Sequence, residues 1–392
     1  MKHKQLPDPS EEAKALSHKL SEKIRSAILR HKELSFSQYM NMALYHPKYG
    51  YYSSALPKLG ASGDFVTAPE ISPIFSRCLA RQAQQVLVEL DSPNIIEFGA
   101  GQGTMAKDIL LELIALEQPL ERYYILEVSA DLRARQKQTI SEALPTEWAQ
   151  KVVWLDQLPE TQIDAVVFAN EVLDAMPFER LRIEPERSLM GYVKLTDSGF
   201  DWDYQPITNH AMQKFANQLI KHLGGVSHLG YETEINLNIS PWLKSLNQSI
   251  RHGSVILIDY GYVRAEYYQA ARVMGTLRCH YQHRAHQNPF FYPGIQDITA
   301  HVDFTAVAES GYDNGFKVAG FTTQANFLMG AGMLEMAVNP NMPIEQQIAI
   351  AQQIKTLTLP DEMGETFKVI ALNKGVDLPM MGFAVRDLRH QL

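Results

Sequence analysis

The sequence predicts an α/β protein with a doubly wound parallel sheet, N-terminal helices and a β-rich insertion. Short apolar segments alternate with segments of helical periodicity between residues 94 and 169. Such alternation is typical of parallel strands that helices cover on both faces. The alternation breaks over residues 180–236, where apolar and polar residues follow one another at strand spacing, and it resumes afterwards.

The first ninety residues predict helices joined by one long connection. Leucines and isoleucines recur at helical spacing within residues 11–30, which predicts an amphipathic helix. Ser35 and Gln38 have the spacing of a capping box and predict the start of a second helix. Residues 46–73 are rich in Pro, Gly, Tyr and Ser and are long for a plain connection. A third helix is expected over residues 73–90.

The strands and helices of the sheet follow in order. Strands are expected at residues 94–98, 123–128, 152–155 and 164–169, and helices at residues 105–116 and 130–143. The insertion contains a helical pattern around 208–223, and a helix is expected near 240–250. Two further strands are expected at 254–260 and 367–372. Residues 264–300 show no regular pattern, so we expect an irregular, aromatic segment there.

Composition limits the function classes. The net charge of −8 argues against general binding to nucleic-acid phosphates, although arginines and histidines cluster within residues 278–286. Two cysteines, Cys78 and Cys279, are too few for a disulfide framework or a four-cysteine zinc site. The histidines lack a spacing typical of metal ligands, so we expect no metal.

Targeting and membrane signals are absent from the sequence. No run of about 18 apolar residues predicts a transmembrane helix, so we expect no membrane insertion. The first residues have neither a secretory apolar core nor the acid-poor composition of a transit peptide. Together with the low cysteine count, this favours a reducing, cytoplasmic location.

A glycine-rich turn follows the first strand of the alternation. Glu97 and Phe98 lead into Gly99, Gly101 and Gly103, and a helix follows. Glycine lets the chain turn sharply and lets the backbone approach a ligand without a Cβ in the way. Ligands of open α/β sheets bind at the carboxyl ends of the strands, where the strand order reverses. The turn therefore predicts a site for an adenosine-bearing cofactor.

An acid closes the next strand. Glu127 lies 24 positions after Gly103, where a carboxylate can accept hydrogen bonds from both ribose hydroxyls. Dinucleotide folds prefer G-x-G-x-x-G, whereas this turn is G-x-G-x-G with Glu97 two residues before its first glycine. The spacing favours S-adenosylmethionine over a nicotinamide cofactor. The alternative is a tight turn that binds no ligand, followed by a glutamate that stands there by chance.

Polar residues follow the fourth strand of the alternation. Asn170, Glu171 and Asp174 stand there, at a position that faces the reactive end of a ligand in a doubly wound sheet. Asn170 and Glu171 are suited to position a nucleophilic nitrogen or to bind a cationic side chain, with Asp174 assisting. The alternative is a helix N-cap with solvated acids.

Two more segments, 63–72 and 293–304, are dense in polar and turn residues. The second contains His301 and Asp303, which are candidates for a general base and its orienting carboxylate. A satisfied structural pair is the equal alternative.

Five segments together resemble the MidA-like methyltransferase family, which includes a mitochondrial complex I assembly-factor arginine methyltransferase and many bacterial relatives. The matching segments are Tyr45–Tyr52, Gly63–Pro73, Glu97–Thr104, Phe168–Pro177 and Asp297–Phe304. The resemblance runs from about residue 30 to the C-terminus.

The resemblance implies a class I methyltransferase fold, which is Rossmann-like, that binds S-adenosylmethionine and methylates a protein arginine. It implies that Thr67 and Glu70 close over the cofactor, that Glu127 holds the ribose and that Glu171 is the acid on the acceptor side. The candidate catalytic residues are Glu171, Asp174, His301 and Asp303. The candidate cofactor-binding residues are Thr67, Glu70, Glu97, Gly99, Gly101, Gly103, Glu127 and Asn170.

Three regions and a protein partner are expected on this basis. Residues 1–90 form an N-terminal helical region with a cofactor-covering loop, residues 91–180 and 237–392 form the methyltransferase core, and residues 181–236 form an inserted β-rich subdomain. The partner is a protein substrate in a bacterial cytoplasm, with a respiratory-complex subunit suggested by the mitochondrial family member. The sequence does not give the oligomeric state, and a homodimer is one candidate.

Two other functions remain as alternatives to a methyltransferase. One is an NAD-dependent oxidoreductase that uses the same glycine turn. The other is a non-catalytic assembly or binding factor that keeps a methyltransferase fold.

Overall fold

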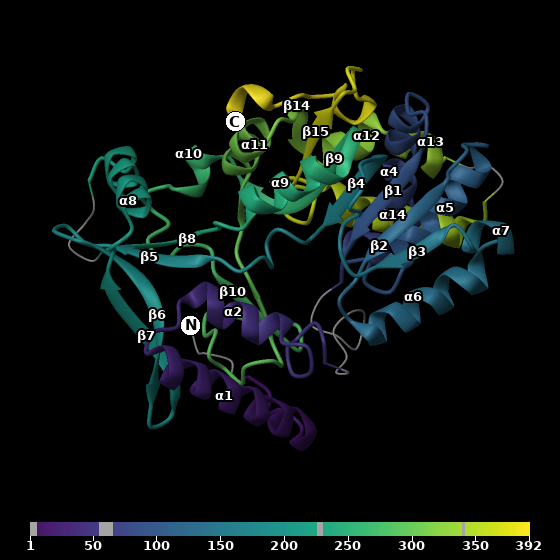
Figure 1. Cartoon of the computed structure of the whole chain (residues 1–392). Helices are drawn as coiled ribbons and strands as arrows, with labels where there is room; N and C mark the ends of the chain where they lie inside the picture. The colour runs from purple at the N-terminus through teal and green to yellow at the C-terminus, as the bar shows by residue number, and fades with distance from the viewer. Residues whose placement is uncertain (1–5, 55–65, 226–229, 339–341) are drawn as a thin grey trace. The chain divides into compact units, whose positions relative to one another are not determined.

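The structure is a computed structural model that describes residues 6–54, 66–225, 230–338 and 342–392 (Figure 1). The chain divides into two compact units, each formed by segments that are distant in sequence. Unit 1 comprises Met1–Phe65, Asp174–Asn238 and Arg264–His301. Unit 2 comprises Val66–Leu173, Ile239–Val263 and Val302–Leu392.

Unit 2 is built on one large sheet whose strand order is β14-β15-β9-β4-β1-β2-β3. Its strands are β1 (Asn94–Phe98), β2 (Arg122–Leu126), β3 (Val152–Leu155), β4 (Ile163–Asn170), β9 (Ile250–Tyr262), β14 (Lys317–Thr323) and β15 (Phe367–Lys374), and the short β13 (Val302–Asp303) pairs with β9. The strands from β3 to β9 are parallel, whereas β14 and β15 are antiparallel. The strand order reverses beside β1, which lies between β2 and β4.

Helices cover both faces of this sheet. They are α3 (Ala68–Ile71), α4 (Pro73–Leu87), α5 (Thr104–Ala115), α6 (Ala130–Ala143), α7 (Thr146–Ala149), α9 (Ile239–Ser249), α11 (Phe304–Asp313), α12 (Gln324–Gly330), α13 (Met333–Ala337) and α14 (Ile344–Thr358), with 3-10 turns η1 (Met381–Phe383) and η2 (Arg389–Gln391). Ile95 and Val166 pack in the core that includes α4 and α5. Their neighbours Ile96 and Val167 point to the other face and are equally buried. The predicted doubly wound α/β fold is therefore confirmed.

The register of the parallel strands brings three strand ends to one level. Phe98 at the end of β1 lies opposite Leu126 of β2 and Ala169 of β4. Ala169 in turn lies opposite Leu257 of β9. The residues that follow β1 and β2, and the last residue of β4, therefore meet at one edge of the sheet.

Unit 1 contains two N-terminal helices and two small antiparallel sheets. Its elements are α1 (Glu11–His31), α2 (Phe36–Tyr45), β5 (Glu179–Ile183), β6 (Ser188–Thr196), β7 (Gly199–Pro206), α8 (His210–His222), β8 (Tyr231–Ile235), α10 (Arg264–Tyr267), β10 (Arg278–Tyr281), β11 (Arg284–His286) and β12 (Asp297–Thr299). The four-stranded sheet has the order β7-β6-β5-β8, which confirms the β-rich insertion. The capping box of α2 is also confirmed, since Ser35 and Gln38 bond each other's backbone N–H.

One expectation about unit 1 is wrong. Residues 264–300 are not wholly irregular, because β11, β10 and β12 form a three-stranded sheet within them. These strands have three or four residues each, which is too short for a periodic pattern. Cys279 and Ile298 lie opposite each other in this sheet and are buried with Leu20 and Phe36 of the N-terminal helices.

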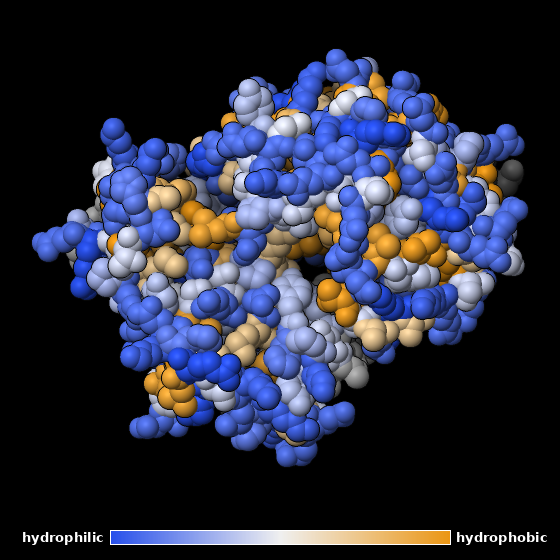
Figure 2. Space-filling model, viewed as in Figure 1, coloured by the Kyte–Doolittle hydropathy of each residue, from blue (hydrophilic) through white to orange (hydrophobic). Residues whose placement is uncertain are grey.

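Surface character agrees with the composition. The face of the molecule in Figure 2 is mostly hydrophilic, with apolar side chains in small groups. Among the described residues, no helix has both the length and the apolar composition needed to span a membrane.

Gly253 offers a test of the pairing between β4 and β9. Its φ is +150°, and an added Cβ would lie 1.8 Å from the carbonyl oxygen of Ala165 in the neighbouring strand. We expect Gly253→Ala to lower the melting temperature strongly, with a loss of about 3 kcal/mol or more, because two packed backbones have to separate.

Gly199→Ala is the matched control for this substitution. Gly199 has a φ of +138°, but an added Cβ would meet no described atom within 4 Å. We expect a smaller loss, of about 1 kcal/mol, from backbone strain alone. Equal shifts of the melting temperature for the two variants would contradict the collision with Ala165.

Candidate functional site

The glycine turn joins β1 to α5 at the carboxyl edge of the sheet. Gly99, Gly101 and Gly103 have φ values of +63°, +52° and +84°, which L side chains rarely adopt. The Gly99 N–H donates to the carbonyl of Leu126 over 3.1 Å, so the start of the turn is fixed to the end of β2. A Cβ on Gly103 would lie 3.1 Å from Cα of Gln136, so α6 approaches the turn closely. Glycine is therefore required both for conformation and for space.

Glu127 lies beside the turn, directly after β2. Its side chain is buried, and its two carboxylate oxygens have separate donors. Oε1 accepts from the backbone N–H of Ser129 over 2.8 Å, and Oε2 accepts from Nε2 of Gln136 over 3.1 Å. A carboxylate accepts about four hydrogen bonds in all, so these bonds are compatible with ribose hydroxyls as further donors.

Gln136 is a site residue that the sequence interpretation missed. Its Nε2 donates both to Glu127 and to the carbonyl of Gly101, the latter over 2.9 Å. It lies on the buried stripe of α6 between Leu132 and Ile140. A polar residue within an otherwise apolar stripe was the signal in the sequence that could have indicated it.

Glu97 faces the interior of the sheet beneath the turn. Its side chain is 1% exposed, and it accepts a hydrogen bond from the hydroxyl of Tyr123 over 2.7 Å. The pKa of Glu97 is raised to about 8, mainly by burial and to a smaller extent by the charge of Glu127, while the Tyr123 hydrogen bond acts to lower it. The geometry gives Glu97 a supporting position under the turn, and its predicted contact with the cofactor stays a prediction.

Thr67 and Glu70 lie at the short helix α3. Thr67 is its N-cap, and Glu70 Oε1 accepts from Nε2 of Gln102 in the glycine turn over 3.2 Å. Partial burial raises the pKa of Glu70. Glu70 is therefore next to the turn, and its role in covering the cofactor stays a prediction. Gly63–Phe65 of the same predicted segment lie outside the described residues.

Asn170 and Glu171 stand at the end of β4, one strand from the glycine turn. Nδ2 of Asn170 donates to Oε1 of Glu171 over 3.2 Å. Within the described residues, the buried Oδ1 of Asn170 has no hydrogen-bond partner. Glu171 has a φ of +54°, a left-handed conformation that costs a non-glycine residue about 1–2 kcal/mol and is concentrated at functional sites. The Oδ1 acceptor of Asn170 and the left-handed backbone of Glu171 therefore lie together at this edge of the sheet.

Asp259 fixes the backbone that follows Glu171, and it too was missed. Its carboxylate is fully buried on β9 and accepts from the N–H groups of Leu173 and Tyr260, over 3.0 and 2.9 Å. The N–H of Glu171 donates to Ile258 over 2.9 Å. An acid within an apolar strand was the available signal.

The remaining predicted catalytic residues are Asp303, Asp174 and His301, and the described contacts of each are with residues other than the glycine turn. Asp303 is the N-cap of α11, and its Oδ1 accepts from the N–H of Ala306 over 3.1 Å. This is a structural contact of Asp303, whereas the alternative weighed from the sequence was a satisfied pair with His301. Asp174 lies in unit 1, is buried, and accepts from the N–H of Ala300 through its carbonyl.

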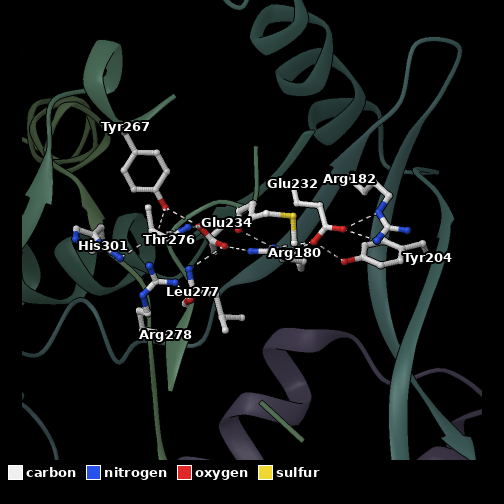
Figure 3. Close-up of polar contacts among 11 residues, drawn as sticks. Arg180, Arg182, Tyr204, Glu232, Glu234, Tyr267, Thr276, Leu277, Arg278 and His301 are labelled. Atoms are coloured by element: carbon white, nitrogen blue, oxygen red, sulfur yellow. Dashed lines mark hydrogen bonds and ion pairs between the residues drawn. The ribbon is translucent and has the colours of Figure 1, made fainter. Parts of the chain in front are cut away.

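His301 ends unit 1 and is connected by its backbone to a buried polar network (Figure 3). Its N–H donates to Oγ1 of Thr276 over 3.1 Å. The N–H and the hydroxyl of Thr276 both donate to Glu234, over 2.8 and 2.9 Å. The backbone of His301 is therefore anchored, and the role of its imidazole stays a prediction.

The same network holds the four-stranded sheet of unit 1 together. Arg180 bonds both Glu232 and Glu234, and Arg182 bonds Glu232 while its guanidinium lies 3.7 Å from the ring centroid of Tyr204 (Figure 3). Two cations and two carboxylates balance, so the buried charges are compensated. We therefore assign this network a structural role.

The geometry of unit 2 fits an adenosine-bearing cofactor. The three glycines of the turn place no Cβ between its backbone and a ligand. Glu127 is fixed by hydrogen bonds beside the turn, and Asn170 offers a buried acceptor at the end of β4, on the other side of β1. All three stand at the reversal of strand order, where ligands of such sheets bind.

Comparison with known proteins decides which cofactor this is. The model of the family described as "Putative S-adenosyl-L-methionine-dependent methyltransferase" matches residues 78–322, more than half of the chain. The chain belongs to this family. The MidA-like resemblance and the class I methyltransferase fold are thereby confirmed.

Solved and curated relatives cover nearly the whole chain. A crystal structure from Burkholderia thailandensis bound to S-adenosyl-homocysteine is 38% identical with a TM-score of 0.93, over 99% of this chain and 100% of that one. The mitochondrial protein arginine methyltransferase NDUFAF7 homolog of Drosophila melanogaster is 27% identical over 97% of this chain and 92% of its own length. The human protein arginine methyltransferase NDUFAF7 is 25% identical over 86% and 80%.

The cofactor of this methyltransferase is S-adenosylmethionine. The family and the S-adenosyl-homocysteine in the structural relative support it directly. The NAD-dependent oxidoreductase considered from the glycine turn is therefore set aside.

The pH dependence of stability tests whether Glu97, beneath the glycine turn, holds a proton in the folded chain. Its pKa is about 8 in the folded chain and near 4.5 in the unfolded chain. The stability that Glu97 contributes is complete below pH 4.5 and is lost as the pH rises to about 8. We expect the melting temperature of the wild type to fall relative to that of Glu97→Gln between these values, and the difference to stay constant above pH 8. A difference independent of pH would contradict a proton held on Glu97.

Proposed function

We propose that this methyltransferase transfers its methyl group to an arginine side chain of a protein. Curated relatives that span nearly the whole chain carry the name protein arginine methyltransferase, at 23–27% identity. The observation that carries the proposal to this chain's own residues is the strained acid Glu171 beside Asn170 at the end of β4.

A carboxylate at this place suits a guanidinium acceptor. A guanidinium is protonated and binds carboxylates through two parallel hydrogen bonds. Glu171 would localise the positive charge on part of the guanidinium, which leaves one nitrogen more nucleophilic. When bound, S-adenosylmethionine supplies a methyl group on a sulfonium. Glu171 would hold the nitrogen in line with that methyl group, and such positioning provides much of the rate.

The other site residues have roles in binding the cofactor. Gly99, Gly101 and Gly103 would line its methionine part, and Glu127 would accept from its ribose hydroxyls. Thr67 and Glu70 would close over it, and Asn170 would accept a hydrogen bond through Oδ1. Asp174, His301 and Asp303 remain candidates on the acceptor side; the helix cap at Asp303 is the stronger assignment for that residue.

The proposed setting is the cytoplasm of a bacterium. Cys78 and Cys279 are free and buried, which suits a reducing compartment. The relative from Burkholderia thailandensis matches this chain over its full length. A respiratory-complex subunit is the first acceptor to test, on the family resemblance.

Glu171→Gln separates methyl transfer from cofactor binding. We expect the variant to lose transfer of labelled methyl groups by about 100-fold or more, because the neutral amide cannot orient a cationic acceptor. It should still bind S-adenosyl-homocysteine in calorimetry. The assay uses extract of a deletion strain as acceptor, with mass spectrometry to locate the methylated residue.

Glu160→Gln is the control, since Glu160 is an exposed acid on the loop after β3. It should transfer at the wild-type rate. Label on a residue other than arginine would refute the proposed acceptor, and wild-type transfer by Glu171→Gln would refute the role of Glu171. Cofactor binding without transfer into any protein would favour the non-catalytic assembly factor.

A further inference from the structure

Gln136 of α6 connects the glycine turn to the acid after β2. We propose that Gln136 is a positioning residue that holds the Glu127 carboxylate in the orientation that accepts the ribose hydroxyls of the cofactor. This rests on the proposed ribose role of Glu127 and is independent of the arginine acceptor.

Both hydrogens of the Gln136 amide are used. Nε2 donates to Oε2 of Glu127 over 3.1 Å and to the carbonyl of Gly101 over 2.9 Å. A primary amide has two N–H donors, so one side chain joins the acid and the turn. The position of the carboxylate is therefore coupled to that of the backbone that lines the cofactor.

Trp154 fixes which way the amide faces. Its indole Nε1 donates to Oε1 of Gln136 over 2.8 Å. An indole N–H only donates, whereas the carboxylate of Glu127 and the carbonyl of Gly101 only accept. The amide oxygen must therefore face Trp154 and the amide nitrogen must face Glu127. Gln136 is fully buried, so an unmade bond here is not replaced by water.

The second carboxylate oxygen and the helix complete the arrangement. Ser129, the N-cap of α6, donates its backbone N–H to Oε1 of Glu127, so the carboxylate is held at both oxygens by the same helix. Oγ1 of Thr139, about one turn after Gln136, donates to the carbonyl of Gln102 over 2.9 Å. Hydrogen bonds therefore connect helix α6 both to the turn and to the acid.

The test compares two ligands that differ only in the ribose. Calorimetry gives the Kd of S-adenosyl-homocysteine and of its analogue without the 2′- and 3′-hydroxyls. Gln136→Glu is nearly isosteric and keeps an acceptor for Trp154, but it removes both donors and places a like charge next to Glu127. Gln138→Glu adds the same charge on the exposed face of α6 and is the control.

We expect the wild type and Gln138→Glu to prefer S-adenosyl-homocysteine over the analogue by about tenfold or more. Gln136→Glu should lose this preference, and its affinity for S-adenosyl-homocysteine should rise as the pH falls and the added acid is neutralised. Gln136→Met, which adds no charge, should lose the preference at every pH, and it serves if Gln136→Glu folds poorly.

A general packing role for Gln136 predicts another result. Equal weakening of both ligands in the Gln136 variants would overturn the proposal, as would an unchanged preference. Glu127→Gln identifies a failure of the premise, because a wild-type preference in that variant would remove Glu127 from the ribose. None of these measurements involves a methyl acceptor, so they stand apart from the test of arginine methylation.

Discussion

The site in unit 2 depends on the register in which β1 pairs with β2 and β4. Phe98 lies opposite Leu126 and Ala169, so the glycine turn, Glu127 and Asn170 stand at one level of the sheet. A slip of one residue would exchange the two faces of a strand and move its last side chain away from the others. Both faces of these strands are buried, so the packing of the core specifies the register. The packing of apolar side chains in the core therefore determines where Glu127 and Asn170 stand.

Unusual backbone conformations shape the site at the carboxyl edge of the large sheet. The three positive φ values of the turn and the left-handed Glu171 are unfavourable for ordinary side chains, and hydrogen bonds from neighbouring strands hold them in place. Asp259 contributes one of the bonds that hold the segment after Glu171, since it accepts from the N–H of Leu173. Such constraint prepares a site before its ligand arrives, which lowers the cost of ordering the site on binding.

Local sequence patterns predicted most of unit 2. Apolar runs and helical periodicity located β1, β3 and α6 to the residue, because each is set by its own neighbours in sequence. The turn, Glu127 and Asn170 were predicted as site residues because glycines and polar side chains at the ends of parallel strands lie at the edge where ligands bind. The structure places them at that edge, and their contact with the cofactor stays a prediction. Gln136 and Asp259 were missed because their importance comes from partners on other elements. A single polar residue in an apolar stripe indicates an exception without identifying its partner.

Unit 1 shows where local patterns end. It combines three segments that are far apart in the chain, and its strands β10, β11 and β12 are too short for a period. Its buried network joins β5, β7 and β8 to residues 274–277 through Arg180, Glu232 and Glu234. Charged residues at strand spacing predict a solvated face, and only the tertiary structure shows that these are buried and paired.

A crystal structure of the protein with S-adenosyl-homocysteine tests this account most directly. The account predicts that the ribose hydroxyls lie within hydrogen-bond distance of Glu127, that the amino-acid part follows the Gly99–Gly103 turn and that the sulfur faces the end of β4. A ribose bound by other residues, with the Glu127 carboxylate turned away from the ligand, would contradict it.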